Sequence, residues 1–180
     1  MVKLERQNKK VNDKLYKKAL KELRTVIEGN VPIDHVGSTA IPRMYGKNII
    51  DILVGAATDE EMEMLSNKII ELGYFPGSKR TGYVYRFFAS TEEETKAGDV
   101  HIHLVKTDSD RYKDFLILRN YLLKNPEERI NYSNLKKTIL KDGHSIREDY
   151  KVIKSEYVSK LLDRSREDYY KYIFTIQWGY

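Results

Sequence analysis

A short loop between two apolar segments carries the residue types that hold phosphate groups. Gly37, Ser38 and Thr39 directly follow the segment IDHV, and Lys47 comes just before the strand-like run that ends in DILV. Glycine lets the backbone approach a ligand closely, amides and hydroxyls at such a turn can bind a phosphate, and lysine adds a mobile positive charge. The loop is not a P-loop, because eight residues separate Gly37 from the next glycine. These residues indicate either a phosphate-binding turn or a tight turn whose hydroxyls bond to their own backbone.

Asp51 is a carboxylate inside an otherwise apolar run, between two isoleucines and the sequence ILV. Burying a charge there is costly unless the group is paired, hydrogen-bonded or bound to a metal. In two-metal phosphoryl-transfer sites a second carboxylate stands two residues further on, on the same face of the strand, and Leu53 occupies that position here. Asp51 is therefore either a ligand of one divalent ion or a buried cap or salt-bridge partner.

Two histidines are spaced for one face of a strand. His101 and His103 alternate with apolar residues in DVHIHLV, so on a strand their side chains project together, about 7 Å apart. Such a pair could bind a metal, contact an anion or transfer a proton. The alternative is a pair of interior histidines whose nitrogens are satisfied by neighbouring groups.

Three basic residues elsewhere could complete an anion site. Arg86 alternates with Val84 and Phe88, and its guanidinium could clamp an anion or lie at a sheet edge with a buried stem. Arg119 and Lys154 lie in segments with helical periodicity and could face the same cleft or solvent.

Composition bounds the class of protein. The 180 residues are 41% hydrophobic and 33% charged, which is typical of one soluble globular domain. The absence of cysteine excludes disulfides, thiolate metal sites and a cysteine nucleophile. We find no signal-peptide core and no apolar run of about 20 residues, and expect a cytoplasmic protein that does not span a membrane. A net charge of +5 favours an anionic partner, but basic and acidic residues are interspersed, so nucleic acid is the less favoured partner.

Periodicity predicts the elements that position these residues. An amphipathic helix is expected over about 11–28, then paired strands at 33–36 and 48–54. Thr58–Glu61 matches a capping box that begins a helix to about Leu72. Alternating patterns at 82–90 and 99–105 predict two more strands, joined through the acidic hairpin region 91–99.

Helical periods dominate after residue 107. Pro126 fits the first turn of a helix, and Ser145–Glu148 and Ser165–Asp168 match capping patterns that would start two more helices. The order of elements predicts an α+β core over about 11–107 with a helical extension over about 108–180, in a single domain.

The ordered set HVGSTAIP, IIDILV, HIHLV, LRNYLLKNP and a final Y…K…Y pattern resembles the GrpB, or UPF0157-like, family, which also occurs as a domain fused to some dephospho-CoA kinases. The resemblance runs from His35 to about Val158. It implies a nucleotidyltransferase-like fold, a mixed sheet with flanking helices, in which Gly37 and Ser38 form the phosphate-binding turn. It also implies that Asp51 is the remaining metal-binding carboxylate.

The chain departs from the pattern of that family at three positions. Leu53 replaces the second acid of an active nucleotidyltransferase, Arg43 replaces a glycine, and Asn48 replaces a proline. The first departure weakens a two-metal mechanism, and the other two alter the loop. The resemblance does not name a reaction, because the family has no firmly assigned activity.

We expect a nucleotide or another phosphorylated small molecule to bind in a cleft lined by the loop, Asp51, Arg86 and the two histidines. If the protein is an enzyme, it transfers a nucleotidyl or phosphoryl group, with one Mg²⁺ or Mn²⁺ on Asp51 and His103 and a proton moved by His101 or His103. The alternative is a non-catalytic module with an eroded metal site that senses a nucleotide or docks a protein. RNA binding is a third reading, and the oligomeric state is not predicted.

Overall fold

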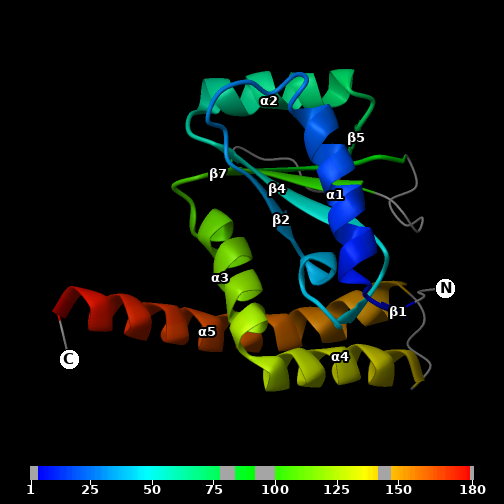
Figure 1. The fold of residues 1–180 in the computed structure, drawn as a ribbon, viewed down its shortest axis with the longest axis vertical. Helices are drawn as coiled ribbons and strands as arrows, with labels where there is room; N and C mark the ends of the chain where they lie inside the picture. The colour runs from blue at the N-terminus through cyan, green and yellow to red at the C-terminus, as the bar shows by residue number, and fades with distance from the viewer. Residues whose placement is uncertain (1–3, 78–83, 92–99, 142–146, 179–180) are drawn as a thin grey trace.

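The computed structural model describes residues 4–77, 84–91, 100–141 and 147–178. A five-stranded mixed sheet lies between two helical layers, with α1 and α2 on one side and the helices after residue 107 on the other (Figure 1). This confirms the predicted α+β class with a C-terminal helical extension. The strands, in their spatial order, are β2 (Ile33–Val36), β4 (Ile50–Ala56), β7 (Val100–Lys106), β6 (Tyr85–Ala89) and β5 (Phe75–Pro76). The helices are α1 (Lys9–Leu23), α2 (Asp59–Glu71), α3 (Asp110–Lys124), α4 (Pro126–Lys141) and α5 (Arg147–Trp178).

The register of the sheet sets which residues share a face. β4 runs parallel to β7, whereas β2 and β4, and β6 and β7, pair antiparallel, as the predicted strand pairs require. Asp51 lies opposite Val36 on one side and His101 on the other, and the next pair on that face joins Leu53 to His103. The carboxylate and both imidazoles therefore project from adjacent strands toward the same side.

The other face of the same strands forms the main core. Ile50, Ile52 and Val54 are fully buried and pack with Leu65 of α2. The stripe predicted for the first helix also packs there. The helix itself ends at Leu23 rather than Glu28, because turns take over from Arg24 onward. The residues of that stripe are Leu15, Ala19, Leu23, Val26 and Ile27.

The start of α2 agrees with its predicted capping box. The Thr58 side chain accepts a hydrogen bond from the Glu61 amide, and the Glu61 carboxylate accepts one from the Ala57 amide. The first bond satisfies an amide that the first turn of a helix leaves without a partner, and the second holds the residue just before the cap.

The loop between β2 and β4 contains short elements that periodicity did not predict. It begins with the one-turn helix η1 (Ser38–Ala40) and continues through β3 (Tyr45–Gly46), which pairs with β1 (Glu5–Arg6). Gln7 stabilises this loop, because its side-chain amide donates a hydrogen bond to the Gly46 carbonyl at 2.9 Å.

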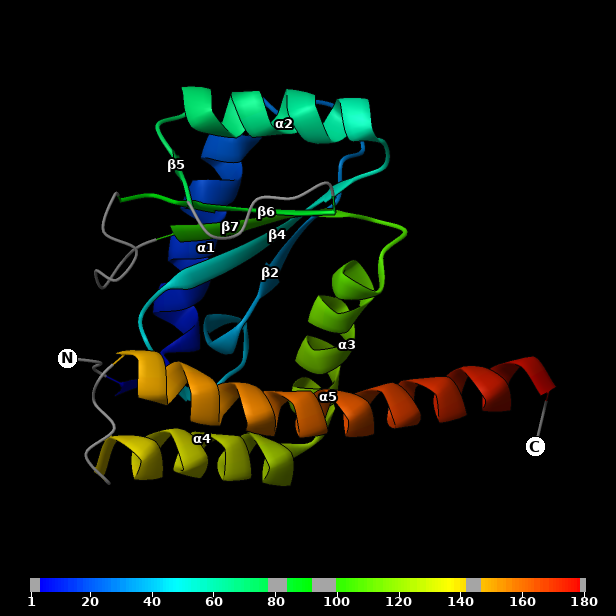
Figure 2. The same cartoon turned by 180° about the vertical axis from the view of Figure 1, so that it is seen from behind.

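The C-terminal helices differ from the prediction at one point. Pro126 does begin α4, but the expected new start at Ser165 is wrong, because α5 runs unbroken from Arg147 to Trp178. The Ser165 hydroxyl donates to the Leu161 carbonyl at 2.6 Å and so sits inside the helix instead of capping one. Figure 2 shows the C-terminal part of α5 extending away from the sheet.

Three predicted features fall partly or wholly outside the described ranges. They are the strand start at residues 82 and 83, the hairpin region from residue 92 onward, and the capping pattern at residues 145 and 146. Within the described ranges, no helix combines the length and apolar content needed to cross a bilayer.

Candidate functional site

Asp51 lies between the two predicted histidines. One carboxylate oxygen, Oδ1, is 3.2 Å from His103 Nε2 and 3.6 Å from His101 Nδ1. The carboxylate keeps 27% of its side-chain surface exposed, whereas the imidazoles keep 14% and 10%. The structure therefore brings together the three residues predicted to be catalytic, in a polar cluster that solvent reaches through Asp51.

The hydrogen-bond partners suggest the tautomer of each histidine. His103 Nδ1 is 2.8 Å from the Tyr85 hydroxyl, so a neutral His103 that donates from Nε2 to Asp51 accepts from the phenol. His101 directs Nδ1 toward Asp51, and its buried Nε2 has no hydrogen-bond partner among the described residues. A neutral His101 would then present a lone pair at Nε2.

Gly37 is required by both conformation and contact. Its φ of +71° lies in the left-handed region, and a Cβ atom built there would lie 2.2 Å from Asp51 Oδ2. Only a residue without a side chain allows the backbone of the turn to pack directly on the carboxylate. The predicted turn and the predicted carboxylate are therefore neighbours.

Ser38 meets a lysine that sequence reasoning missed. Lys136 of α4 is 1% exposed, and its amino group donates to the Ser38 hydroxyl at 3.0 Å and to the Tyr45 carbonyl. It also lies over the ring of Tyr132. A signal was present, because Tyr132, Lys136 and Ile139 fall on one helical stripe whose other members are apolar.

The surroundings favour the charged form of Asp51 and disfavour the charged form of Lys136. Burial acts to raise the pKa of Asp51, but hydrogen bonds from His101 and His103 outweigh it and hold that pKa below its ordinary value. Burial lowers the pKa of Lys136 well below its usual range. The charge of Lys154 acts in the same direction, and Asp51 opposes both. Asp51 is thus ionised, while the proton on Lys136 is weakly held.

Thr39 is structural and faces away from Asp51. It is fully buried, its hydroxyl donates to the Ile49 carbonyl at 3.1 Å, and the same oxygen is 3.0 Å from His35 Nε2. His35 lies opposite Ile52, and so it projects from the face that does not carry Asp51.

Arg86 does not join the cluster. It lies opposite Leu104, a residue of the core that packs on α2, and pairs through two hydrogen bonds with the Glu63 carboxylate of that helix. The expected anion clamp is therefore an ion pair on the opposite side of the sheet.

The other residues predicted to bind the ligand are Arg119, Lys154 and Lys47, and each has a different set of neighbours. Arg119 of α3 donates to Asp34 at 2.8 Å and to the His35 carbonyl at 3.1 Å, along the edge of β2. Lys154 of α5 is half-buried, and its charge acts on Lys136. Lys47 follows β3, and its carbonyl lies 3.5 Å from the Gln7 amide nitrogen.

The residues around Asp51 do not fit Mg²⁺ or Mn²⁺ as they are arranged. Hard cations prefer several oxygen ligands, but the neighbours of this carboxylate are imidazoles that donate to it. Leu53, at the place of a second acid, is fully buried. No group of three histidine, cysteine or acidic residues in the described part of the chain is arranged to hold a metal ion.

Comparisons with known proteins agree on one family. The model of the family described as GrpB protein matches residues 2–164. The glutamate-rich protein GrpB of Alkalihalophilus pseudofirmus is 31% identical over 156 residues, which cover 83% of this chain and 88% of that protein. The crystal structure of the conserved protein GrpB from Enterococcus faecalis matches with a TM-score of 0.77 and 22% identity. That match covers 93% of this chain and 99% of the other and shows the same fold.

Structures of the poly(U) polymerase Cid1 are also similar, more distantly. One with MgGTP bound covers 73% of this chain and 42% of its own, at 12% identity and a TM-score of 0.48. A likeness of that size carries no argument about the chemistry of this chain.

Proposed function

The chain belongs to the GrpB family, and from that premise we propose that it binds a nucleotide or another small phosphate-bearing ligand at the Gly37–Ser38 turn. One observation carries the proposal: the buried amino group of Lys136 lies 3.0 Å from the Ser38 hydroxyl, beside the carboxylate that packs on Gly37. Buried lysines are rare, and this one joins the helical extension to the turn that the sequence singled out.

A phosphate bound at the turn would stabilise the protonated amino group of Lys136. Burial and Lys154 disfavour the proton on Lys136. An anion beside the amino group would favour the charged form and raise its pKa toward the ordinary value. Ser38 would donate its hydroxyl proton to a phosphate oxygen, and Lys136 would supply the opposite charge.

Asp51 has a different part in this proposal from that of a metal ligand. Its Oδ1 is directed at two imidazoles, which it holds in place, while its Oδ2 lies against Gly37. His103 is further fixed by Tyr85. The cluster therefore orients two aromatic nitrogen rings at the edge of the site, where they can contact the rest of the ligand.

Group transfer is the second candidate, and the bare His101 nitrogen favours it. A carboxylate on Nδ1 and a free lone pair on Nε2 form the arrangement of a general base. With a nucleoside triphosphate, the attacking hydroxyl oxygen would bond to the α-phosphorus as its proton passes to His101 Nε2. Pyrophosphate would leave with the electrons of the broken P–O bond, and Asp51 would stabilise the imidazolium. This route uses only residues of the chain.

Titration calorimetry with nucleotides and phosphorylated metabolites, in the presence and absence of Mg²⁺ or Mn²⁺, tests the proposal. Lys136→Met keeps the length of the side chain and removes the amino group. Replacing buried charges by apolar groups of similar volume is often tolerated, so we expect a folded protein with at least about tenfold weaker binding. Lys141→Met, an exposed change on the same helix, should bind like the wild type.

Proton uptake gives an independent readout. If Lys136 gains a proton when the ligand binds, the observed binding enthalpy should vary with the ionisation enthalpy of the buffer in the wild type and should not do so in Lys136→Met. Unchanged affinity in a folded Lys136→Met, or no binding of any phosphorylated compound to the wild type, would overturn the proposal. Turnover that disappears in His101→Gln while affinity persists would select the transfer reaction.

A further inference from the structure

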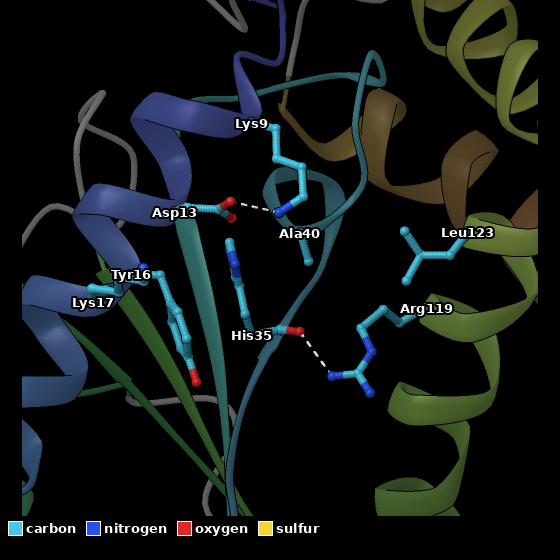
Figure 3. A pocket seen from close by; sticks show the side chains of 8 residues that line it. All are labelled: Lys9, Asp13, Tyr16, Lys17, His35, Ala40, Arg119 and Leu123. Carbon is cyan, nitrogen blue, oxygen red and sulfur yellow. Dashed lines mark hydrogen bonds and ion pairs between the residues drawn. The ribbon is translucent and has the colours of Figure 1, made fainter.

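A hollow lies along the edge of β2, and its lining does not include the Asp51 cluster. It has a volume of about 320 Å³, is open to solvent, and is bordered by α1, the edge of β2, η1 and α3 (Figure 3). This size is near the lower end of roughly 300–1,000 Å³, the range usual for small-molecule sites. Ser38, Asp51 and Lys136 are not among the residues that line this hollow, so substitutions distinguish it from the site proposed above.

His35 forms one wall and presents a hydrogen-bond acceptor. Thr39 donates its hydroxyl proton to the Ile49 carbonyl, so the same oxygen must accept from His35 Nε2. Burial lowers the pKa of His35 to about 4, which leaves the ring neutral with its lone pair at Nδ1. The ring stacks on Tyr16, with centroids 4.6 Å apart and planes 8° apart, and this contact holds its orientation.

Positive charge borders the same hollow. Arg119 is fixed by Asp34 and by the His35 carbonyl through Nη1, and its Nη2 has no hydrogen-bond partner among the described residues. Lys9 reaches in from α1 and bonds to Asp13 Oδ2 at 2.5 Å, and Figure 3 shows its amino group between that carboxylate and η1. Arg119 and Lys9 thus approach the hollow from opposite helices, and Lys17 of α1 also lines it.

The remaining lining is a second acceptor and an apolar surface. Asp13 Oδ1 forms no hydrogen bond within the described structure, and it lies near the imidazole whose pKa it affects. Leu123 of α3 and Ala40 of η1 line the hollow with carbon atoms. The hollow therefore combines donors for an oxyanion, acceptors for hydroxyl groups and an apolar patch for a carbon skeleton.

We propose that this hollow is a binding site for a small hydroxylated phosphate ester of the sugar phosphate class. The phosphate lies between Arg119 Nη2 and Lys9, hydroxyl groups donate to His35 Nδ1 and Asp13, and the carbon skeleton covers Leu123. The ligand must carry both features, since a phosphate alone leaves the two acceptors unused, and a neutral sugar offers no oxyanion to Arg119 Nη2 and to the Lys9 amino group.

Calorimetric titration of the full chain with ribose 5-phosphate, inorganic phosphate and ribose tests this site. We expect ribose 5-phosphate to bind more tightly than inorganic phosphate and ribose to show no measurable binding. Lys9→Gln should weaken ribose 5-phosphate by about three- to fivefold, the usual worth of one partly exposed ion pair. Lys10→Gln, the neighbouring exposed lysine, should leave the affinity unchanged.

A second variant checks the hydroxyl contacts. His35→Phe keeps an aromatic ring against Tyr16 and removes the acceptor, so it should bring the affinity for ribose 5-phosphate down toward that for inorganic phosphate and leave the latter unchanged. Thermal unfolding verifies that this variant is folded. If it is not folded, the affinity of Lys9→Gln for ribose 5-phosphate tests the proposed site instead.

The outcomes separate this site from the Ser38 site. Equal binding by wild type and Lys9→Gln overturns the proposal, as does ribose 5-phosphate binding that is lost in Lys136→Met and retained in Lys9→Gln. Binding that Lys136→Met leaves intact supports it, whatever that variant does to nucleotide affinity.

Discussion

The two faces of the central sheet are built from alternate residues of the same strands and have opposite characters. Toward α1 and α2, fully buried isoleucine, valine and leucine side chains of β4 and β7 form a continuous apolar core. Toward the C-terminal helices, the same two strands direct Asp51, His101 and His103 into a hydrogen-bonded cluster. The first arrangement stabilises by removing apolar area from water, whereas the second must satisfy each polar group it buries.

The difference teaches where binding can occur in this fold. On the polar face, apolar packing resumes beyond the cluster, with Leu53 and Val105 against α3. The polar groups of this face gather toward the start of β4 and β7, and there the turn at Gly37 and the lysine of α4 meet them. Substitutions on the apolar face should therefore change stability without changing ligand affinity.

The largest expected effect comes from the apolar face. Leu65→Ala should lower the free energy of unfolding by about 3 kcal/mol, because it leaves a cavity beneath α2 that the core fills only in part. Urea denaturation measures the loss. Affinity for a phosphorylated ligand should not change, and Met64→Ala, at a 45% exposed position on the same helix, should cost less than about 0.5 kcal/mol. A large loss of affinity in Leu65→Ala would break the separation of the two faces.

Gly37→Ala tests the close contact on the polar face. We expect a loss of about 2–3 kcal/mol of stability together with impaired ligand binding, since the new Cβ would displace the Asp51 carboxylate and the φ of +71° disfavours alanine. Gly29→Ala is the matched control, because Gly29 has the same φ of +71° but nothing within 4 Å of its Cβ position. It should show only the conformational part, about 1 kcal/mol, with normal binding.

His35 tests how strictly the α1 side of the sheet excludes charge. Its pKa falls from 6.5 to about 4 on folding, so between these values the unfolded chain holds a proton that the folded protein lacks. Stability should therefore decrease as the pH falls from 6.5 to 4, by about 2 kcal/mol after allowance for partial exposure. Denaturation at several pH values should show that the free energy of unfolding depends less steeply on pH in His35→Gln than in the wild type. An identical slope would mean that His35 does not carry the effect.

The smallest effect should come from Arg86, the cation on the wrong side of the sheet for the Asp51 cluster. Its partner Glu63 has a 63% exposed side chain, so Arg86→Ala should cost about 0.5–1 kcal/mol at most. Ligand affinity should equal that of the wild type and of Glu63→Ala. Weaker binding in Arg86→Ala alone would show that this guanidinium reaches the ligand after all.

Much of the fold was predictable because secondary structure follows local periodicity. The strands at 33–36 and along β4, the capping box at Thr58 and the start of α4 at Pro126 all depend on residues a few positions apart. The predictions that failed were those in which a local signal competed with packing. Ser165 looked like a cap but bonds back inside α5, and the first helix stops at Leu23 although its apolar stripe continues into the core.

The sequence by itself determined that Gly37, Ser38, Asp51, His101 and His103 are special, because a glycine turn, a carboxylate in an apolar strand and an i, i+2 pair are local patterns. Only the tertiary structure decided which of them meet and what joins them. The register between β6 and β7 sends Arg86 to the opposite face, and the packing of α4 brings Lys136 to Ser38 across 98 positions of the chain. Strand register and helix packing depend on contacts between distant segments, which periodicity along a single segment does not encode.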